Sequence, residues 1–257
     1  MIIKQSGQSV PNIDILSRFS VVGGELYLDN LKVDRLTGNI SGGAISKWLN
    51  KTWNAVGDSI TEHNARTTKN YQDYIKDRVT GLTVNNYGVS GTGWFTPSGS
   101  GGTNQIFNRI AAMNASADLI TVFAGTNDVA SVGKAFVLGA YGDTDQTTSF
   151  YGAVDYTIKQ LVIKYPTKTI AVFTPLQRDI ASTAYGVVTE ANMIAVADAI
   201  IKVAGRYSIP VLDLYRFGNM YPWNANFKTA MMPDGLHPND AGHVAIADKI
   251  LSFINTL

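Results

Sequence analysis

The sequence predicts an α/β protein with a parallel sheet of about five strands, preceded by a short β-rich arm. From residue 52 onward, short apolar runs typical of buried strands alternate with longer segments of helical apolar spacing. The first 50 residues instead carry short alternating segments broken by glycine pairs. The chain has 257 residues, 45% of them hydrophobic, which suffices for one large domain with a small appendage.

Residues 1–50 form the predicted N-terminal arm. Apolar and polar side chains alternate in Glu25–Leu28 and Leu31–Val33, and Gly23-Gly24 and Gly42-Gly43 interrupt the pattern, as expected of β-hairpins. The arm is too short to build much core alone. We therefore expect it to pack on the main domain or on a partner chain, where it could join copies of the chain into a homo-oligomer.

Residues 51–257 form the predicted main domain, with alternating strands and helices. The candidate strands are Thr52–Val56, Leu82–Asn86, Leu119–Phe123, Thr169–Phe173 and Ile209–Leu214. The apolar stripes of the candidate helices lie within Ile106–Met113, Tyr151–Tyr165, Met193–Ala204 and Val244–Ile254, and Asn239 or Asp240 caps the last. This alternation predicts a flavodoxin-like doubly wound sheet, which binds ligands beyond the carboxyl ends of its strands.

Composition excludes several classes of function. The net charge is +1 and only 16% of residues are charged, so no strong field attracts nucleic acid or anionic membrane. The absence of cysteine excludes disulfides, thiolate metal sites and cysteine nucleophiles. No apolar run approaches the roughly 18 residues of a membrane-spanning helix, and the first residues lack a secretory signal pattern. We expect a soluble chain, cytoplasmic or particle-associated.

Polar residues suited to acyl transfer follow the predicted strands. Ser59 comes directly after the first strand in GDSIT, Asn127 follows the third, and Asp234 and His237 precede the last helix. Taken singly, each also fits a turn, a cap or a packed histidine. Together they offer a nucleophile, an oxyanion donor, an orienting acid and a base, which acyl transfer requires.

A glycine-rich segment, Asn86–Gly93, follows the second strand. Its glycines allow the backbone to approach a ligand and to offer N–H groups to an anion, or they simply adopt positive φ angles. The segment does not complete a dinucleotide fingerprint, and the chain has no Walker pattern. Nucleotide binding is therefore the least favoured function of such a sheet.

These motifs resemble the SGNH hydrolase family, also called GDSL-like esterases. Ser59 stands in GDSI, Gly91 in NYGVSG, Asn127 in GTND and His237 in DGLHPN. The four blocks occur in the family's order and span most of residues 55–245, whereas the first 50 residues lie outside the resemblance.

The resemblance implies a role for each residue. Ser59 would be the nucleophile and His237 its base, oriented by Asp234. The oxyanion hole would combine the backbone N–H groups of Ser59 and Gly91 with the side-chain amide of Asn127. No metal or organic cofactor is implied.

Other residues near the same edge have less defined roles. Gly88 is an alternative to Gly91 as oxyanion donor, although the Asn-x-x-x-Ser-Gly spacing favours Gly91. We expect His63 on a solvated first helical turn and His243 packed locally in the last helix. Four candidates for substrate contact, which also fit a turn, a salt bridge or the core, are Asp58, Trp94, Arg178 and Trp223.

The sequence thus predicts a serine esterase that hydrolyses short acyl esters through an acyl-enzyme. Carbohydrate O-acetyl groups are the expected substrate class, because the loops are polar, tryptophans are available for stacking and no long apolar lid is present. The alternative is a non-catalytic glycan-binding module, or an attachment module of a phage tail or cell-wall protein, which the β-rich arm suggests.

Overall fold

The computed structural model describes residues 19–22, 25–28, 31–33, 40–44, 46–63, 65–95, 104–129, 136–182 and 188–257. The sequence also predicts two connections from their content of glycine and small polar residues, a loop at Thr96–Thr103 and a longer connection at Ala130–Phe150. The first lies outside the described residues, as do residues 130–135 of the second. The chain divides into two compact units, Met1–Leu49 and Asn50–Leu257.

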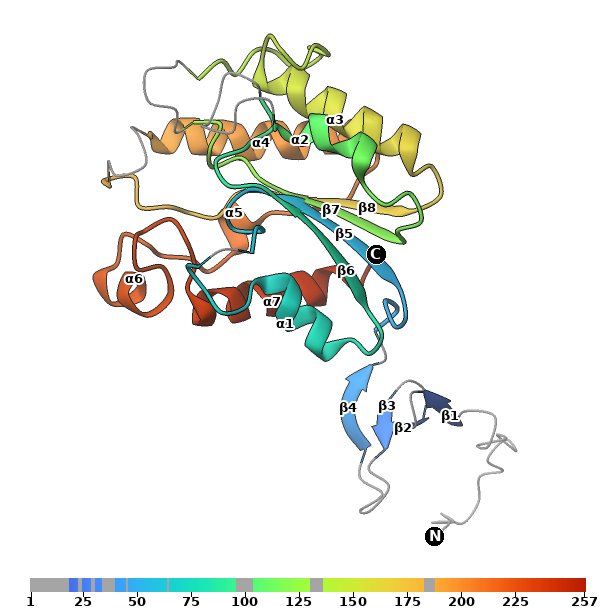
Figure 1. Ribbon diagram of the computed structural model, residues 1–257. Helices are drawn as coiled ribbons and strands as arrows, with labels where there is room; N and C mark the ends of the chain where they lie inside the picture. The colour runs from blue at the N-terminus through green and yellow to red at the C-terminus, as the bar shows by residue number, and fades with distance from the viewer. Residues whose placement is uncertain are drawn as a thin grey trace, which may run out of the picture. The chain divides into compact units, whose positions relative to one another are not determined.

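The first unit contains a four-stranded antiparallel sheet whose strands pair in chain order (Figure 1). The segments predicted from their alternating pattern, Glu25–Leu28 and Leu31–Val33, are strands β2 and β3. They are flanked by β1, Phe19–Val22, and β4, Ile40–Ala44. The β-rich nature of the arm is therefore confirmed.

The second unit is built on five parallel strands in the order β6-β5-β7-β8-β9. This is the predicted flavodoxin-like order, because the second strand of the domain lies at the edge beside the first. The bounds are β5 Thr52–Gly57, β6 Thr83–Gly88, β7 Leu119–Phe123, β8 Thr169–Phe173 and β9 Val211–Leu212.

Strand β9 is shorter than the predicted Ile209–Leu214. Asp213 ends it, because its carboxylate accepts the N–H of Arg216 at 3.2 Å and so begins the next helix. The same carboxylate oxygen accepts the hydroxyl of Thr174 at 2.9 Å, which ties that helix to the end of β8.

Helices cover both faces of this sheet, α1 and α7 on one and α2, α3 and α4 on the other (Figure 1). Their bounds are α1 Tyr71–Arg78, α2 Ile106–Arg109, α3 Phe150–Lys164, α4 Glu190–Arg206 and α7 Asp240–Ile254. Two short helices, α5 Leu214–Phe217 and α6 Ala225–Met231, follow β9. None of the described helices is long and apolar enough to cross a membrane.

Helix α1 packs near the site, and apolar periodicity does not predict it. Five of its eight residues are polar or charged, and its buried side chains are Tyr71, Gln72 and Ile75. Reciprocal hydrogen bonding between Asn70 and Asp73 begins it as a capping box. The N–H of Tyr71 donates to Nδ1 of buried His243 at 3.1 Å, which packs α1 against α7.

The strand register brings the ends of neighbouring strands to one level. Gly57 at the end of β5 pairs with Gly88 of β6 and with Phe123 of β7, and Phe123 pairs with Phe173 of β8. Residues that follow these four strands therefore meet at one edge of the sheet. In a doubly wound sheet this edge is where ligands bind.

Candidate active site

Ser59 lies in a tight turn directly after β5. The carbonyl of Asp58 accepts the N–H groups of Thr61 and Glu62 at 3.1 and 2.9 Å, which closes the turn around the serine. A side chain on Gly57 would lie 2.1 Å from Oγ1 of Thr61 and 2.6 Å from a backbone oxygen of β7. Only glycine fits there, so the glycine of the GDSI motif allows the turn to approach β7.

Three amide side chains anchor this turn from outside the motif. Asn70, Gln72 and Asn86 donate to the carbonyl of Thr61 at 3.0, 2.6 and 2.7 Å. Sequence reasoning missed all three, because amide side chains are common in loops and their convergence on one carbonyl requires the folded chain. Their bonds fix the position of the turn that carries Ser59.

Ser59, His237 and Asp234 form a continuous hydrogen-bonded array. The Oγ of Ser59 lies 2.9 Å from Nε2 of His237, and Nδ1 of His237 lies 2.7 Å from Oδ2 of Asp234. Both Ser59 and His237 are 7% exposed. With Nδ1 donating to the carboxylate, the ring presents its Nε2 lone pair to the serine hydroxyl, which is the tautomer a general base needs.

The short Asp234–His237 loop folds so that its carboxylate orients the imidazole. Gly235 adopts a positive φ of 76°, and Oδ1 of Asp234 accepts the N–H groups of Leu236 and His237 at 2.9 and 2.7 Å. Burial alone would raise the pKa of Asp234, but these bonds and the one to the ring outweigh burial and hold that pKa well below its ordinary value. The carboxylate therefore stays ionised beside His237.

The candidate oxyanion donors come from the loops after β6 and β7. Gly91 has a φ of 73°, which glycine adopts without strain. We call the residues that follow β6, Val89–Gly93, the glycine loop. The side-chain amide of Asn127 donates one hydrogen to the carbonyl of Thr92 at 2.9 Å, and this bond fixes the amide beside that loop. The N–H of the alternative donor, Gly88, already donates to the side chain of Asn86 at 2.8 Å.

Trp94 does not lie where a substrate could stack on it. Its side chain is fully buried, and its indole N–H donates to the carbonyl of Ala124 at 3.1 Å. The reason is the carboxylate of Asp128, which accepts the backbone N–H groups of Trp94 and Phe95 at 3.3 and 2.8 Å. These bonds draw the segment inward, so Trp94 takes the core position that the sequence also allows and offers no exposed ring for stacking.

Asp58 and Arg178 are also buried. Asp58 is 2% exposed, and its carboxylate accepts the N–H of Ile60 at 2.9 Å, which is the turn-holding role that the sequence allows. Arg178 is 3% exposed and donates to the carbonyl and hydroxyl oxygens of Thr126, each at 3.3 Å. Burial lowers the pKa of Arg178, and the charge of Asp234 opposes that effect.

Trp223 is the one predicted contact residue that remains accessible, with 62% of its surface exposed. It lies just before α6, and its ring meets that of Tyr221 at 77° and 5.9 Å. Tyr221 in turn packs edge-on against Phe227 at 5.3 Å. We call Tyr221, Trp223 and Phe227 the aromatic cluster; α6 lies at the end of the sheet where the parallel strands finish (Figure 1).

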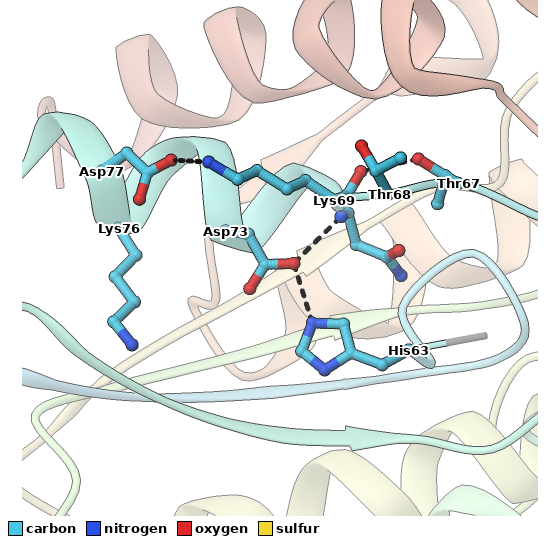
Figure 2. A pocket seen from close by; sticks show the side chains of 8 residues that line it. His63, Thr67, Thr68, Lys69, Asp73, Lys76 and Asp77 are labelled. Carbon is cyan, nitrogen blue, oxygen red and sulfur yellow. Dashed lines mark hydrogen bonds and ion pairs between the residues drawn. The ribbon is translucent and has the colours of Figure 1, made fainter. Parts of the chain in front are cut away.

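His63 is exposed, but it lies in irregular chain ahead of α1 and not in a helix. Its Nε2 is 2.7 Å from Oδ2 of Asp73, at the wall of a pocket of about 380 Å³ (Figure 2). The lining residues are His63, Thr67, Thr68, Lys69, Asn70, Asp73, Lys76 and Asp77. Because this set includes none of the hydrogen-bonded array, the pocket is separate from the Ser59 site.

Known proteins share this fold. Residues 55–245 match the model of the GDSL-like Lipase/Acylhydrolase family. A solved structure from Lactobacillus plantarum is 30% identical, with a TM-score of 0.70 over 80% of this chain and 97% of that chain. A possible lipase from Chitinophaga pinensis is 24% identical, with a TM-score of 0.60 over 80% and 98%. Comparison with curated proteins gives no match.

An acetyl-xylooligosaccharide esterase from Geobacillus has the same fold, with 17% identity and a TM-score of 0.55 over 81% of this chain and 96% of that chain. The fold and the site together define the class of ester hydrolases built on a doubly wound parallel sheet. Since the family match spans most of the chain, this chain belongs to the GDSL-like lipase/acylhydrolase family. It is a carboxylic ester hydrolase, as the sequence predicts.

Replacing Asp58 with Asn should make stability less sensitive to pH. Burial raises the pKa of Asp58 to about 7, the charge of Asp128 adds to the increase, and the Ile60 N–H bond and the charge of Arg109 oppose it. The folded state therefore holds this proton more tightly than the unfolded state. The contribution of Asp58 to stability falls as pH rises from about 4 to about 7, and then levels off.

The variant Asp58→Asn keeps the acceptor for Ile60 but lacks the titration. Its free energy of unfolding relative to wild type should rise by about 1–4 kcal/mol between pH 4 and pH 8, measured by urea unfolding. Asp240→Asn is the control, because hydrogen bonds led by that of Thr67 lower the pKa of Asp240 to about 2, below this pH range. A constant difference between Asp58→Asn and wild type from pH 4 to 8 would show that Asp58 titrates normally.

Proposed function

We propose that this chain is a serine esterase that cleaves short acyl esters through a covalent acyl-enzyme. One observation carries the proposal, the array in which Ser59 Oγ lies 2.9 Å from His237 Nε2 and His237 Nδ1 lies 2.7 Å from Asp234. The first distance allows His237 to accept the proton of Ser59, and the second allows Asp234 to orient the imidazole ring.

In the acylation step His237 takes the hydroxyl proton of Ser59 while Oγ bonds to the ester carbonyl carbon. The carbonyl oxygen becomes an oxyanion. The tetrahedral intermediate then collapses, its bond to the alcohol oxygen breaks, and His237 returns the proton to the departing alcohol. In deacylation His237 takes a proton from water, the resulting hydroxide adds to the acyl carbon, and Ser59 leaves with the proton from His237.

Asp234 assists both acylation and deacylation because its carboxylate remains ionised. It stabilises the imidazolium that forms in each step and keeps Nε2 directed at Ser59. The oxyanion would be bound by the backbone N–H groups of Ser59 and Gly91 and by the amide of Asn127. Preorganised donors of this kind lower the barrier by roughly 2.7–4 kcal/mol each.

For the alcohol we propose a carbohydrate, so that the leaving group is a sugar hydroxyl and the acyl group is acetyl. The aromatic cluster supports this class, because Trp223 offers an exposed ring next to the segment that leads into Asp234. The rings of the aromatic cluster pack edge-on against one another. Because they are already held in place, stacking a sugar on them would cost little side-chain entropy.

Helix α6 is also bonded to the site. Lys228 of α6 pairs with Asp179 at 2.6 Å, and the N–H of Asp179 donates to the carbonyl of Gly235 at 2.8 Å. These bonds tie α6 to the Asp234 loop.

Hydrolysis of p-nitrophenyl acetate, butyrate and octanoate tests the proposed chemistry. Wild-type protein should prefer acetate. Ser59→Ala and His237→Ala should each lower kcat by roughly 10³–10⁶-fold, because nucleophile and base act as a unit. His63→Ala is the matched control and should leave kcat unchanged, since His63 lies outside the array. Circular dichroism of each variant verifies folding.

Equal rates for wild type and Ser59→Ala would contradict the assignment of Ser59. If no ester is hydrolysed and acetylated oligosaccharide still binds, the chain is a glycan-binding module of the alternative kind.

The aromatic cluster is tested with two substrates. Trp223→Ala should lower kcat/KM on acetylated xylo-oligosaccharides by roughly 10-fold, because stacking energies of this kind are about 1–1.5 kcal/mol. It should leave p-nitrophenyl acetate hydrolysis unchanged. Phe217→Ala is the control, since Phe217 is 69% exposed but lies against the C-terminal half of α7, beside Phe253. A Trp223→Ala variant with wild-type kcat/KM on the oligosaccharide would exclude the cluster as a sugar platform.

A further inference from the structure

Arg109, the last residue of α2, joins three segments of the chain through its guanidinium group. Nη1 donates to the carbonyl of Gly57 at 3.0 Å and, through a short bond, to the carbonyl of Tyr87. Nη2 donates to Oγ1 of Thr92 at 3.0 Å. The three acceptors belong to the end of β5, the end of β6 and the glycine loop.

Two of the three acceptors lie close in sequence to a candidate oxyanion donor. Gly57 is two residues before Ser59, and Thr92 directly follows Gly91. The carbonyl of Thr92 accepts the side-chain amide of Asn127 at 2.9 Å. The Arg109 guanidinium therefore holds the backbone next to Ser59 and Gly91 and, through Thr92, the side chain of Asn127.

The segment that carries Arg109 is itself bonded to the glycine loop. The N–H of Gly93 donates to Oε1 of buried Gln105 at 2.7 Å, and the N–H of Ile106 donates to the carbonyl of Gly93 at 3.1 Å. These bonds fix the start of α2 against the glycine loop. Arg109, at the end of the same helix, is thereby placed within reach of Thr92 in that loop.

The guanidinium of Arg109 carries a positive charge close to the candidate oxyanion donors. Burial lowers its pKa to about 10, and the charges of Asp58 and Glu62 oppose that effect. The guanidinium therefore stays protonated at neutral pH. A fixed positive charge next to the donors favours the negative charge that develops on the carbonyl oxygen in the transition state.

We propose that Arg109 is a positioning residue of the oxyanion hole, whose guanidinium fork sets the relative positions of Ser59, Gly91 and Asn127. This inference rests on the proposed serine esterase function. It adds a residue that is not a member of the Ser59–His237–Asp234 array. Lysine cannot replace it, because a single ammonium lacks the planar fork that reaches three acceptors in one geometry.

The chain offers a matched control in Lys164. Its Nζ donates to the carbonyls of Ile110, Ala111 and Met113 at 2.7, 2.8 and 2.8 Å. Like Arg109 it is a cation that binds backbone carbonyls at three points. Its acceptors, however, follow α2 and are not part of the glycine loop.

Arg109→Met and Arg109→Lys should each lower kcat on p-nitrophenyl acetate, Arg109→Met by about 10²-fold and Arg109→Lys by at least about 10-fold, with KM changed less than about 3-fold. Lys164→Met should lower thermal stability and leave kcat unchanged. In the double variant Arg109→Met/Asn127→Ala, the loss should be smaller than the product of the single losses, because Asn127 depends on Arg109 through Thr92.

Wild-type kcat in Arg109→Met, with Ser59→Ala inactive, would overturn the inference and leave the serine esterase proposal intact. Multiplicative losses in the double variant would also contradict it. Hydrogen exchange gives a readout that needs no activity. Peptides that cover residues 57–62 and 88–95 should exchange faster in Arg109→Met than in Lys164→Met, and equal exchange would refute positioning even if no ester were hydrolysed.

Discussion

The site depends on the parallel register of neighbouring strands. Because Gly57 pairs with both Gly88 and Phe123, strands β5, β6 and β7 end at one level. Ser59, Gly91 and Asn127 lie two, three and four residues beyond these ends, so short loops suffice to bring them together. A one-residue shift of any strand would displace its contribution by about 3.3 Å. That displacement exceeds what a hydrogen bond to the same oxyanion tolerates, so the sheet itself specifies the geometry of the site.

Buried polar bonds then convert this edge of the sheet into a rigid site. Amide side chains hold the Ser59 turn through the carbonyl of Thr61, and the carboxylate of Asp128 draws in the backbone that follows the glycine loop. Burial of Asp58 raises its pKa and lowers stability at neutral pH. The protein thus retains an unfavourable buried carboxyl group where it fixes the turn of the nucleophile, as expected when a site is preorganised before substrate binds.

Local patterns predicted the sheet well, because its central strands are continuous apolar runs, and Leu119–Phe123 and Thr169–Phe173 match the predicted bounds. The motif residues could be assigned because each follows a strand and the topology brings strand ends together. Sequence reasoning failed where partners are distant in the chain. Trp94 appeared available for stacking because nothing nearby shows that Asp128, 34 residues later, draws its backbone inward. Arg109 had no local signal, since its acceptor at Gly57 is 52 residues away.

The most direct test of the central claim is covalent labelling with a fluorophosphonate, followed by mass spectrometry of the intact protein and of its peptides. Such a reagent mimics the tetrahedral intermediate and bonds to a serine only where a base activates it. The account predicts one adduct per chain, on Ser59, with labelling absent in Ser59→Ala and slowed at least about 10²-fold in His237→Ala. An adduct on another residue, or equal labelling of wild type and His237→Ala, would contradict the assignment of Ser59 and His237 as nucleophile and base.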